Sequence, residues 1–292
     1  MIDGLAVVDK PAAWTSHDVV ARCRKIFGQK RVGHAGTLDP DATGVLLVGL
    51  GAVTRLMRFL SPLPKSYTGE LVLGVATSTL DSSGEITGTW DMASVGLEEV
   101  RVAAASLVGD IEQIPPMVSA VQVGGRRLYD IARAGGEIER EPRPVTVYRY
   151  EVAPTPVPGV FAIDVGCSSG TYVRTLAADV GSALGGGAHL RNLRRTAIGP
   201  FTSEGAVPLE DLSPEGVLSP GDALPHLARV AVEAEVAAAV GFGKVLDRDA
   251  LGAEGEGPWA VVDGDGRLLA VYAAHKGRTV KPEVVLPPRQ GG

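Results

Sequence analysis

Residues 31–51, RVGHAGTLDPDATGVLLVGLG, determine the centre of the fold. Glycine or proline occurs at four positions between 33 and 44, which predicts a loop, and residues 45–50 form an apolar run with the length of a buried strand. Asp39 lies within this loop. Glycines let a backbone approach a ligand closely, so the loop can present Asp39 to a substrate. A turn capped by Asp39 explains the same residues and, on these residues alone, is the simpler interpretation.

Upstream of this stretch, the sequence predicts one strand and one helix. Residues 5–8 are apolar and lead into Pro11, which indicates a strand that ends in a loop. Ser16 is a suitable N-cap for a following helix, and Gly28 ends it. Apolar residues at helical spacing give this helix one face for the core and leave its basic residues outside. The apolar face consists of Val19, Val20, Cys23, Ile26 and Phe27.

Downstream, the pattern predicts a mixed α+β domain over residues 1–225 and a small β-rich domain over 230–290. A Pro- and acid-rich stretch, 205–226, separates the two, and residues 113–143, rich in Pro, Gly and Arg, are predicted to leave the core as an insertion. Strands are predicted at 67–76, 145–152, 161–167 and 190–198, and helices at 52–60, 98–107 and 171–184. The elements predicted for the small domain are a helix at 231–240 and a hairpin at 259–273.

Charge is segregated along the chain although its sum is acidic. The 292 residues carry a formal net charge of −6. Residues 1–80 hold nine Lys or Arg against six Asp or Glu, and residues 113–200 hold ten Arg against seven acids. The acids gather at 81–112 and 201–235, each with seven against one Arg. Local basic patches steer polyanions whatever the total charge, so the composition leaves a nucleic-acid partner open.

Composition argues against several other classes of protein. No apolar run approaches the ~20 residues that span a bilayer. Residues 1–9 are apolar but carry two aspartates, which predicts a first strand and not a signal peptide. Cys23 and Cys167 are the two cysteines, too few for a disulfide framework, so we expect a reducing cytoplasm. Two cysteines with five scattered histidines also predict no structural metal site.

A series of motifs between residues 8 and 195 gives the loop a family context. GHAGTLDPDATG at 33–44 resembles the catalytic loop of the TruB family of tRNA pseudouridine synthases. The other motifs follow in the family's order, so the resemblance does not depend on one short match. They are VDKP (8–11) with WTSHD (14–18), KSY (65–67), IPPMVSA (114–120) with RRLY (126–129), CSSGTYVR (167–174) and LRR (193–195).

The resemblance implies a fold and a reaction. The fold is a pseudouridine synthase domain with a mixed central sheet and an RNA-clasping insertion, followed by a small PUA-like RNA-binding β domain. The reaction breaks the glycosidic bond of uridine 55 in the T-arm of tRNA, turns the base and rejoins it through carbon, without metal or cofactor. By motif position, Asp39 is the catalytic aspartate, Arg174 is its ion-pair partner, and Tyr67 stacks on the flipped base and takes part in catalysis. Whether Asp39 attacks the sugar or the base, or assists a glycal route, stays open.

The same resemblance assigns residues that bind the substrate or support the site. Tyr172 and Leu193 are expected to line the uridine pocket, and His34 is expected to enter the T-loop from which the base is flipped. The residues expected to support the catalytic loop are Lys10, Pro11 and Gly36. Arginines of the insertion and its flank are expected to bind phosphates. These are Arg126, Arg127, Arg133, Arg140 and Arg143.

Two positions of the insertion depart from the family's pattern. Val118 stands where tyrosine is common and Gln122 where lysine is common, so these two RNA contacts are not carried over.

Three other functions compete with this interpretation: a guide-RNA-dependent pseudouridine synthase, a tRNA-folding factor without catalysis, and a small-molecule enzyme. Asp39, Tyr67 and Arg174 together favour catalysis, and the basic insertion favours RNA. We therefore predict tRNA as the partner, no guide RNA, no membrane partner and a monomer.

Overall fold

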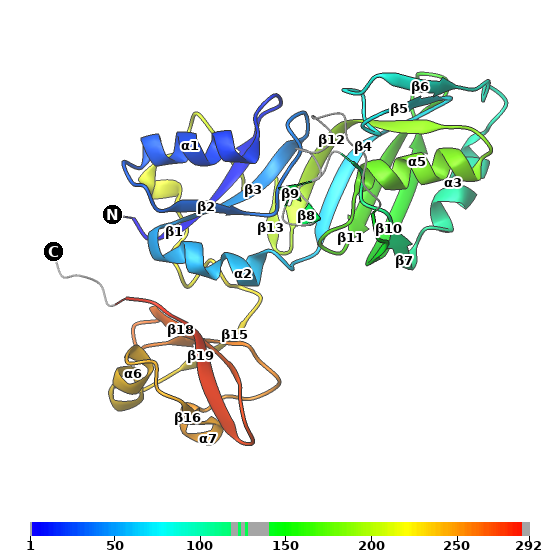
Figure 1. Ribbon diagram of the computed structural model, residues 1–292. Coiled ribbons are helices and arrows are strands. Elements are labelled where there is room, and N and C mark those ends of the chain that lie inside the picture. The colour runs from blue at the N-terminus through cyan, green and yellow to red at the C-terminus, as the bar shows by residue number, and fades with distance from the viewer. Residues whose placement is uncertain (1, 118–121, 124–125, 128–139, 288–292) are drawn as a thin grey trace.

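A mixed β-sheet runs through two lobes of the molecule (Figure 1). The computed structural model describes residues 2–117, 122–123, 126–127 and 140–287. Within them the sheet has ten strands: eight in the order β14-β1-β3-β12-β4-β11-β10-β7, with β2 beside β3 and β13 beside β12. Their bounds are β1 (Gly4–Lys10), β2 (Val32–Ala35), β3 (Thr43–Leu50), β4 (Lys65–Leu73), β7 (Gly109–Gln113), β10 (Arg143–Pro154), β11 (Val160–Cys167), β12 (Ala188–Ile198), β13 (Phe201–Thr202) and β14 (Val207–Pro208).

The N-terminal lobe is built on β1, β2 and β3, and both faces of β3 are buried. Leu46, Val48 and Leu50 point to one side and pack against α1 (Ser16–Ile26). The alternating residues, Val45 and Leu47, pack on the other side against η1 (Gly51–Leu56) and α2 (Met57–Leu60). Successive strand residues face opposite sides of a sheet, so covering both sides requires an uninterrupted apolar run. This is why residues 45–50 carry no polar side chain.

The second lobe is built on β4, β11, β10 and β7, with two helices on one face. α3 (Leu97–Ala105) and α5 (Val173–Ala183) bury their apolar sides against these strands. A hairpin of β5 (Val75–Thr77) and β6 (Ile86–Thr89) lies at the far end of the lobe (Figure 1). The buried helical residues are Val100, Ala103, Ala104, Val173, Leu176, Ala177 and Val180.

Strand β12 joins the lobes. It pairs antiparallel with β4 over its length, but parallel with β3 only at Arg194 and Arg195. The β12–β4 register shifts between Arg191 and Arg194, and Asn192 has a positive φ of 53° there. A bulge of this kind redirects side chains and increases the local bend of a strand. The bulge therefore lies where the two lobes meet, beside the loop that carries Asp39.

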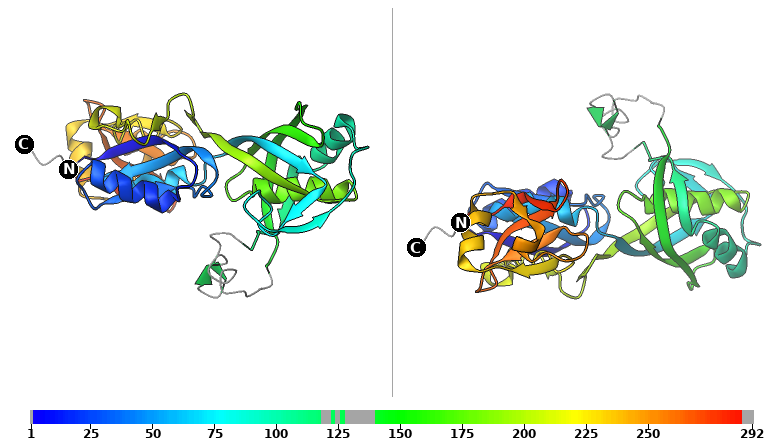
Figure 2. Two further views of the ribbon diagram at one scale, coloured as in Figure 1. Left: turned by 90° about the horizontal axis from the view of Figure 1, so that it is seen from above. Right: turned by 90° about the horizontal axis from the view of Figure 1, so that it is seen from below.

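A second sheet of five described strands, in the order β15-β17-β18-β19-β16, packs under the N-terminal lobe (Figures 1 and 2). Its bounds and those of its helices are β15 (Ala228–Ala231), α6 (Ala234–Gly241), β16 (Leu246–Asp247), α7 (Arg248–Leu251), β17 (Trp259–Val262), β18 (Leu268–Ala274) and β19 (Thr279–Val285). One face joins the same hydrophobic core as Val45 and Leu47, through Ala260, Val262, Leu268, Val271 and Val284. Arg58 also pairs with Glu283 at 3.1 Å, and Arg55 Nη1 donates to the Val285 carbonyl at 2.6 Å.

The α+β fold class and its mixed central sheet are confirmed, but several local predictions were wrong. Thr15, not Ser16, is the N-cap of α1, and it forms a capping box with Asp18. Ser16 instead exchanges hydrogen bonds with the backbone of Leu38 at 3.0 and 3.2 Å, fixing the start of α1 to the loop that carries Asp39. The predicted loop at 33–44 begins with strand β2, because this short segment pairs with β3.

Other corrections concern strands that a local pattern does not reveal. The strand predicted at 67–76 begins at Lys65 and breaks at Gly74, which has a φ of 81° and would place a Cβ 2.8 Å from the Trp90 carbonyl. Strand β19 follows the predicted hairpin, was not predicted, and lies between β18 and β16 in the small sheet. The strands β6 and β7 were also not predicted, and polar residues account for much of both. The helix predicted at 52–60 is 3-10 in its first part.

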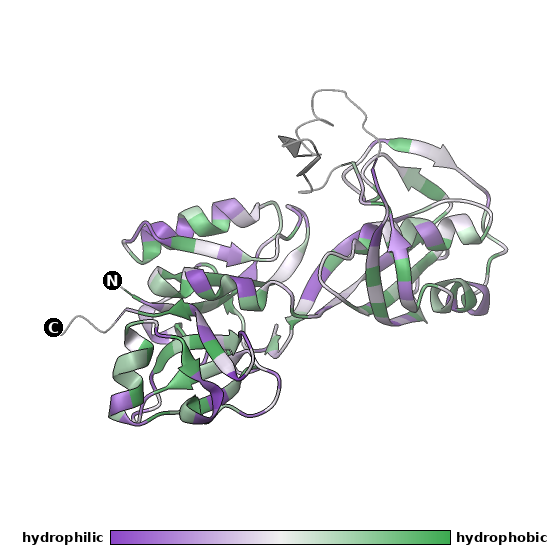
Figure 3. Ribbon diagram, turned by 60° about the horizontal axis from the view of Figure 1, so that its bottom comes forward, coloured by the Kyte–Doolittle hydropathy of each residue, from purple (hydrophilic) through white to green (hydrophobic). Residues whose placement is uncertain are grey.

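Hydropathy follows the same layers. α1 alternates hydrophilic and hydrophobic residues, as expected of a helix with one buried face (Figure 3). Among the residues that the structure describes, no helix is both long and apolar enough to cross a membrane.

Candidate active site

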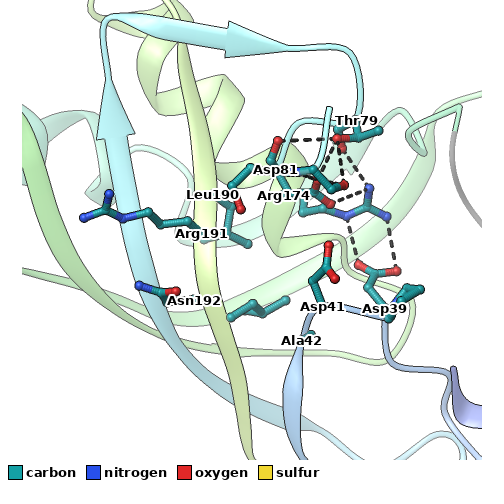
Figure 4. A pocket seen from close by; sticks show the side chains of 13 residues that line it. Asp39, Asp41, Ala42, Thr79, Asp81, Arg174, Leu190, Arg191 and Asn192 are labelled. Atoms are coloured by element: carbon teal, nitrogen blue, oxygen red, sulfur yellow. Dashed lines mark hydrogen bonds and ion pairs between the residues drawn. The ribbon is translucent and has the colours of Figure 1, made fainter. Parts of the chain in front are cut away.

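An ion pair between the two lobes is the centre of the candidate site. Asp39 follows β2 in the N-terminal lobe, and Arg174 lies in the first turn of α5 in the second. Arg174 Nε lies 2.9 Å from Asp39 Oδ2, and Nη2 lies 3.3 Å from Oδ1, so the guanidinium holds both carboxylate oxygens (Figure 4). Only 4% of the Arg174 side chain is exposed, against 39% for Asp39. A bidentate pair fixes the orientation of the carboxylate while leaving it accessible.

A second carboxylate holds Arg174 from behind. Arg174 Nη1 lies 3.3 Å from Asp81 Oδ2 and donates to the Thr79 carbonyl at 2.7 Å. Asp81 is itself held by the hydroxyls of Thr79 and Ser83, each at 2.6 Å, and by the Ser83 backbone N–H at 3.0 Å. Asp81 was not predicted from the sequence, because it lies in an acid-rich stretch. Its only local signal was the polar run TSTLDSS at 77–83.

The surroundings of Asp39 act on its pKa in opposite directions. Burial raises the pKa of this carboxyl above its usual range, and the charge of Arg174 opposes the rise. The charge of Asp81 raises the pKa further, while Lys10 and Arg195 lower it. The cations around Asp39 therefore offset the effect of removing the carboxylate from water.

Lys10 supports the loop after Asp39. Its fully buried ammonium donates to the carbonyls of Pro11, Trp14 and Pro40 at 2.8, 2.7 and 2.9 Å. Burial lowers the pKa of Lys10 to about 8, and the charge of Asp39 opposes this. One side chain thus ties together β1, the turn that follows it and the loop that carries Asp39.

Arg195 supports the loop before Asp39. It is 1% exposed, and its guanidinium donates to the carbonyls of Gly36, Thr37 and Val45 at 3.0, 3.2 and 2.7 Å. Arg195 belongs to the LRR motif of residues 193–195, but the motif alone predicted no role for it. Buried Lys and Arg side chains from β1 and β12 therefore hold the loop on both sides of Asp39.

A cavity of about 230 Å³ lies against the ion pair and is lined by Tyr67, Tyr172 and Leu193, the residues expected to form the uridine pocket. Tyr67, from β4, is 9% exposed, and burial raises the pKa of its hydroxyl. Tyr172 precedes α5, and its backbone N–H and carbonyl bond the Gln113 side chain at 2.7 and 3.1 Å. Gln113, at the end of β7 and 3% exposed, was also missed. Further residues that line this cavity are Gly36, Asp39, Lys65, Arg174 and Arg195.

A second cavity, of about 140 Å³, shares Asp39, Arg174 and Leu193 with the first. The shared side chains therefore stand between the two spaces. Asp41 and Asp81 add carboxylates on this side, and Figure 4 shows them with Arg174 and Asp39. Other residues that line it are Thr79, Ser82, Ser83, Leu190, Arg191 and Asn192.

His34 lies apart from both cavities. It belongs to β2, and its ring contacts that of His17 edge to face, with centroids 5.4 Å apart. Burial lowers the pKa of His34 to about 4, so the ring is neutral at neutral pH. Its Nδ1 is buried and has no hydrogen-bond partner within the described part of the chain. Contact of His34 with RNA stays a prediction.

Most of the insertion lies outside the described residues. Arg126 and Arg127 form strand β9, which pairs with β8 (Gln122–Val123). Arg140 donates to the Pro115 carbonyl at 3.0 Å, and Arg143 is the exposed first residue of β10. Arg133 and Val118 lie outside the described residues. Phosphate binding by these arginines stays a prediction.

Two family models match consecutive parts of the chain. Residues 24–173 match the model of the TruB family pseudouridylate synthase N terminal domain. Residues 174–222 match the model of the tRNA pseudouridylate synthase B C-terminal domain. The boundary falls inside the site, because Asp39, Tyr67 and Tyr172 lie in the first match and Arg174 and Leu193 in the second.

Relatives and solved structures agree with these matches. A protein of Rhodococcus jostii named tRNA pseudouridine synthase B is 46% identical to this chain, and the match covers 98% of this chain and 94% of the relative. A protein of the same name from Nocardia farcinica is also 46% identical, with coverage of 99% of this chain and 94% of the relative. The solved Cbf5-Nop10-Gar1 complex contains a chain with a TM-score of 0.76 and 29% identity, covering 97% of this chain and 85% of that one. An H/ACA RNP bound to a substrate RNA containing 2′-deoxyuridine contains another, with a TM-score of 0.75, 27% identity and coverage of 98% and 86%.

Proposed function

The chain belongs to the TruB family of tRNA pseudouridine synthases, which isomerise uridine 55 of the T-arm, and we propose that Asp39 is the carboxylate that carries this reaction. One observation carries the proposal. Asp39 is held by both oxygens against Arg174, at the wall of a cavity that also contains Tyr67. A carboxylate fixed in this way needs little reorganisation when it meets the reacting ribose or base.

The cavity of about 230 Å³ is proposed to receive the flipped uridine. Tyr67 stacks on the base, an interaction worth roughly 1–3 kcal/mol, and Tyr172 and Leu193 form the other walls. The proposed contacts with the remaining T-arm are His34, in the loop from which the base has left, and Arg126 and Arg127, on phosphates. The proposed supports of the catalytic loop are Lys10, Pro11 and Gly36.

Asp39 must be ionised to act as a nucleophile or as a base. Arg174 favours this form, because a guanidinium 2.9 Å from a carboxylate oxygen stabilises negative charge. Asp81 restrains Arg174 from the other side, so the guanidinium keeps its orientation as the charge on Asp39 changes. Attack on the sugar, attack on the base and a glycal route all start from the same ionised carboxylate.

We further propose that the enzyme acts on tRNA directly, without a guide RNA, as a monomer in the cytoplasm. Direct action is supported by the relatives named tRNA pseudouridine synthase B, which match at 46% identity, against 29% and 27% for the two solved RNP chains. The proposed domains are a catalytic domain over 1–225, with an insertion at about 113–143, and an RNA-binding domain over 230–290. The separate five-stranded sheet supports this division.

The deciding experiment uses purified protein and an unmodified tRNA transcript, without added cofactor. Pseudouridine is mapped by carbodiimide labelling and primer extension. We expect one stop signal, at position 55, that Asp39→Asn abolishes. If the protein binds tRNA but gives no signal at any uridine, the guide-dependent enzyme or the folding factor replaces this proposal.

A further inference from the structure

We propose that Lys65 and Arg195 form a cationic wall of the uridine cavity and stabilise the negative charge of the uracil while it is detached from the ribose. The inference deepens the proposed function and rests on it. It concerns two side chains that the proposed roles of Asp39, Tyr67 and Arg174 leave without a part in the chemistry.

The two side chains reach the same part of the cavity. Lys65 begins β4 and Arg195 lies on the neighbouring β12, where it pairs directly with Tyr67. Both line the cavity of about 230 Å³. A Cβ added to Gly36, which has a φ of 73°, would lie 3.7 Å from Arg195 Nη1 and 3.8 Å from Lys65 Cε. Arg195 and Lys65 therefore flank one point of the cavity wall, next to the tyrosine proposed to hold the base.

Both cations are buried and hydrogen-bond to uncharged groups, although the charge of Arg195 also acts on Asp39. Lys65 is 6% exposed and Arg195 is 1% exposed. The Lys65 ammonium donates to the carbonyls of Ser61 and Leu63 at 2.5 and 2.7 Å. Arg195 donates to backbone carbonyls and also hydrogen-bonds the Tyr67 side chain. Within the described residues neither forms an ion pair, unlike Arg174. Burying a charge without a counterion is unfavourable, so these two cations leave a positive potential that an anionic ligand can satisfy.

Charge differs between the two sides of the Asp39–Arg174 pair. The lining of the uridine cavity has three cations, Lys65, Arg174 and Arg195, and one carboxylate, Asp39. The smaller cavity has three carboxylates and two arginines. Negative charge that develops on a ligand is thus favoured on the side of Tyr67, although the whole chain is acidic.

The reaction produces such a charge. When the C1′–N1 bond breaks, its electron pair stays on N1, and the negative charge spreads over N1, O2 and O4 of the uracil. After the base has turned, C5 supplies the electron pair that forms the C5–C1′ bond. The proton on C5 is then lost to a base and N1 gains a proton, so the product is an isomer of the substrate. Fixed cations favour the charged intermediate and require no proton transfer during cleavage.

The first test separates charge from structure. Lys65→Met removes the charge and keeps most of the aliphatic length, while Lys65→Arg keeps the charge. Single-turnover rates at saturating enzyme are measured beside tRNA Kd and thermal unfolding. We expect Lys65→Met to lose at least about tenfold in rate with Kd within about threefold, and Lys65→Arg to recover most of the loss. The control, Lys25→Met on the exposed side of α1, should keep the wild-type rate.

Arg195 is tested by the same logic. Arg195→Lys and Arg195→Met both lose contacts with the loop carbonyls, but only Arg195→Met loses the charge. We expect Arg195→Met to be slower than Arg195→Lys by at least about tenfold. Equal rates would mean that Arg195 acts only by holding the loop.

A pH profile gives a readout that a purely structural role would not change. Burial lowers the pKa of Lys65 to about 8, so its charge is lost as the pH rises through this value. The groups that face it are Arg195 on β12, the Cys167 thiol on β11, whose pKa burial raises to about 11, and Tyr67 on its own strand, whose pKa is also raised. We expect the wild-type rate to fall above about pH 8 and Lys65→Arg to reduce this fall. Lys10, whose pKa is also about 8, accounts for the part that remains, and an unchanged profile in Lys65→Arg would contradict the role of Lys65.

The last test uses a substrate whose base is a better leaving group. Fluorine at C5 stabilises the uracil anion. On a tRNA with 5-fluorouridine at position 55, the rate at which intact 5-fluorouridine disappears should therefore differ less between Lys65→Met and wild type than the rate on uridine does. A rate of Lys65→Met equal to wild type, or an equal gap with both substrates, would overturn the inference. If wild type itself forms no pseudouridine, the proposed function fails instead. If Lys65→Met does not fold, the comparison of the pH profiles of Lys65→Arg and wild type still tests the inference.

Discussion

At the scale of single residues, the structure joins side chains far apart in the sequence around one carboxylate. Asp39 and Arg174 are 135 residues apart and form a bidentate pair. The motifs predicted both residues, because each lies in a segment with a family resemblance. They did not predict that Asp81 would bind the other side of Arg174, since nothing local in an acidic stretch distinguishes a carboxylate paired within the fold from a solvated one.

Asp39→Asn should abolish turnover and leave tRNA binding within about tenfold, a margin of about 1.4 kcal/mol. The amide keeps the size of the side chain but provides neither a nucleophile nor a strong base. Single-turnover pseudouridine formation and filter binding measure the two effects separately. Complete loss of tRNA binding would instead make Asp39 a structural residue.

Arg174→Lys should slow the reaction by at least about a hundredfold, about 2.7 kcal/mol in the activation free energy. Arg174 contacts both oxygens of Asp39 and also Asp81, and a single ammonium cannot reproduce this fork. The measurement is the single-turnover rate at saturating enzyme, with circular dichroism as the folding control. Near-normal rates would remove Arg174 from the chemistry.

His34 provides a prediction for stability against pH. Its folded pKa, about 4, lies below the usual value of 6.5, so the unfolded chain binds the proton more strongly. Its contribution to stability is therefore present above about pH 6.5 and lost as the pH falls towards 4. Between these two pH values, the free energy of unfolding of wild type should fall by about 1–2 kcal/mol more than that of His34→Gln. Urea unfolding at about pH 7 and about pH 4.5 tests this, and equal losses in both proteins would contradict it.

At the scale of elements, the close contact of β3 and β12 positions the loop that carries Asp39. Gly44 has a φ of 103°, and a Cβ there would lie 2.2 Å from the Arg195 carbonyl. The apolar run after Gly44 predicted β3 correctly because burial on both faces determines its composition. The strands β2, β6 and β7 were missed because they are short and their pairing with β3, β5 and β10, and not their own periodicity, defines them.

Gly44→Ala should destabilise the protein by several kcal/mol, on the order of 3, because both φ and the backbone clash oppose a side chain. Gly109→Ala is the matched control, since Gly109 has a φ of 112° but open space around its missing Cβ. It should cost about 1 kcal/mol. Urea unfolding compares the two, and equal losses would show that backbone strain alone, and not strand contact, constrains Gly44.

At the scale of the whole molecule, the C-terminal sheet shares a hydrophobic core with the N-terminal lobe. Leu268 and Val271 of β18 belong to the same cluster as Leu47 of β3. The sequence indicated a separate β-rich segment, because a Pro- and acid-rich stretch precedes it. The shared core was not predicted, since an apolar strand residue does not reveal which partner covers it.

Leu268→Ala should therefore weaken both parts of the molecule, by about 2–4 kcal/mol. Leu251→Ala is the control, because Leu251 is also buried but belongs to a cluster confined to the C-terminal part. Hydrogen exchange of the β3 and β18 amides resolves the effect by region. Leu268→Ala should reduce protection in both strands, and a loss limited to β18 would contradict a shared core.

The 135 residues between Asp39 and Arg174 also have a consequence during synthesis. At roughly 5–20 residues per second, a ribosome takes roughly 7–27 s to add the arginine after the aspartate. The nascent chain therefore carries the carboxylate that we propose as catalytic for many seconds before its counterion exists. The hydrophobic core that Val262 and Leu268 share with Leu47 stays incomplete longer still, leaving an apolar face open. Catalytic competence arises late in translation, and a chaperone that recognises apolar surface has its longest opportunity at this face.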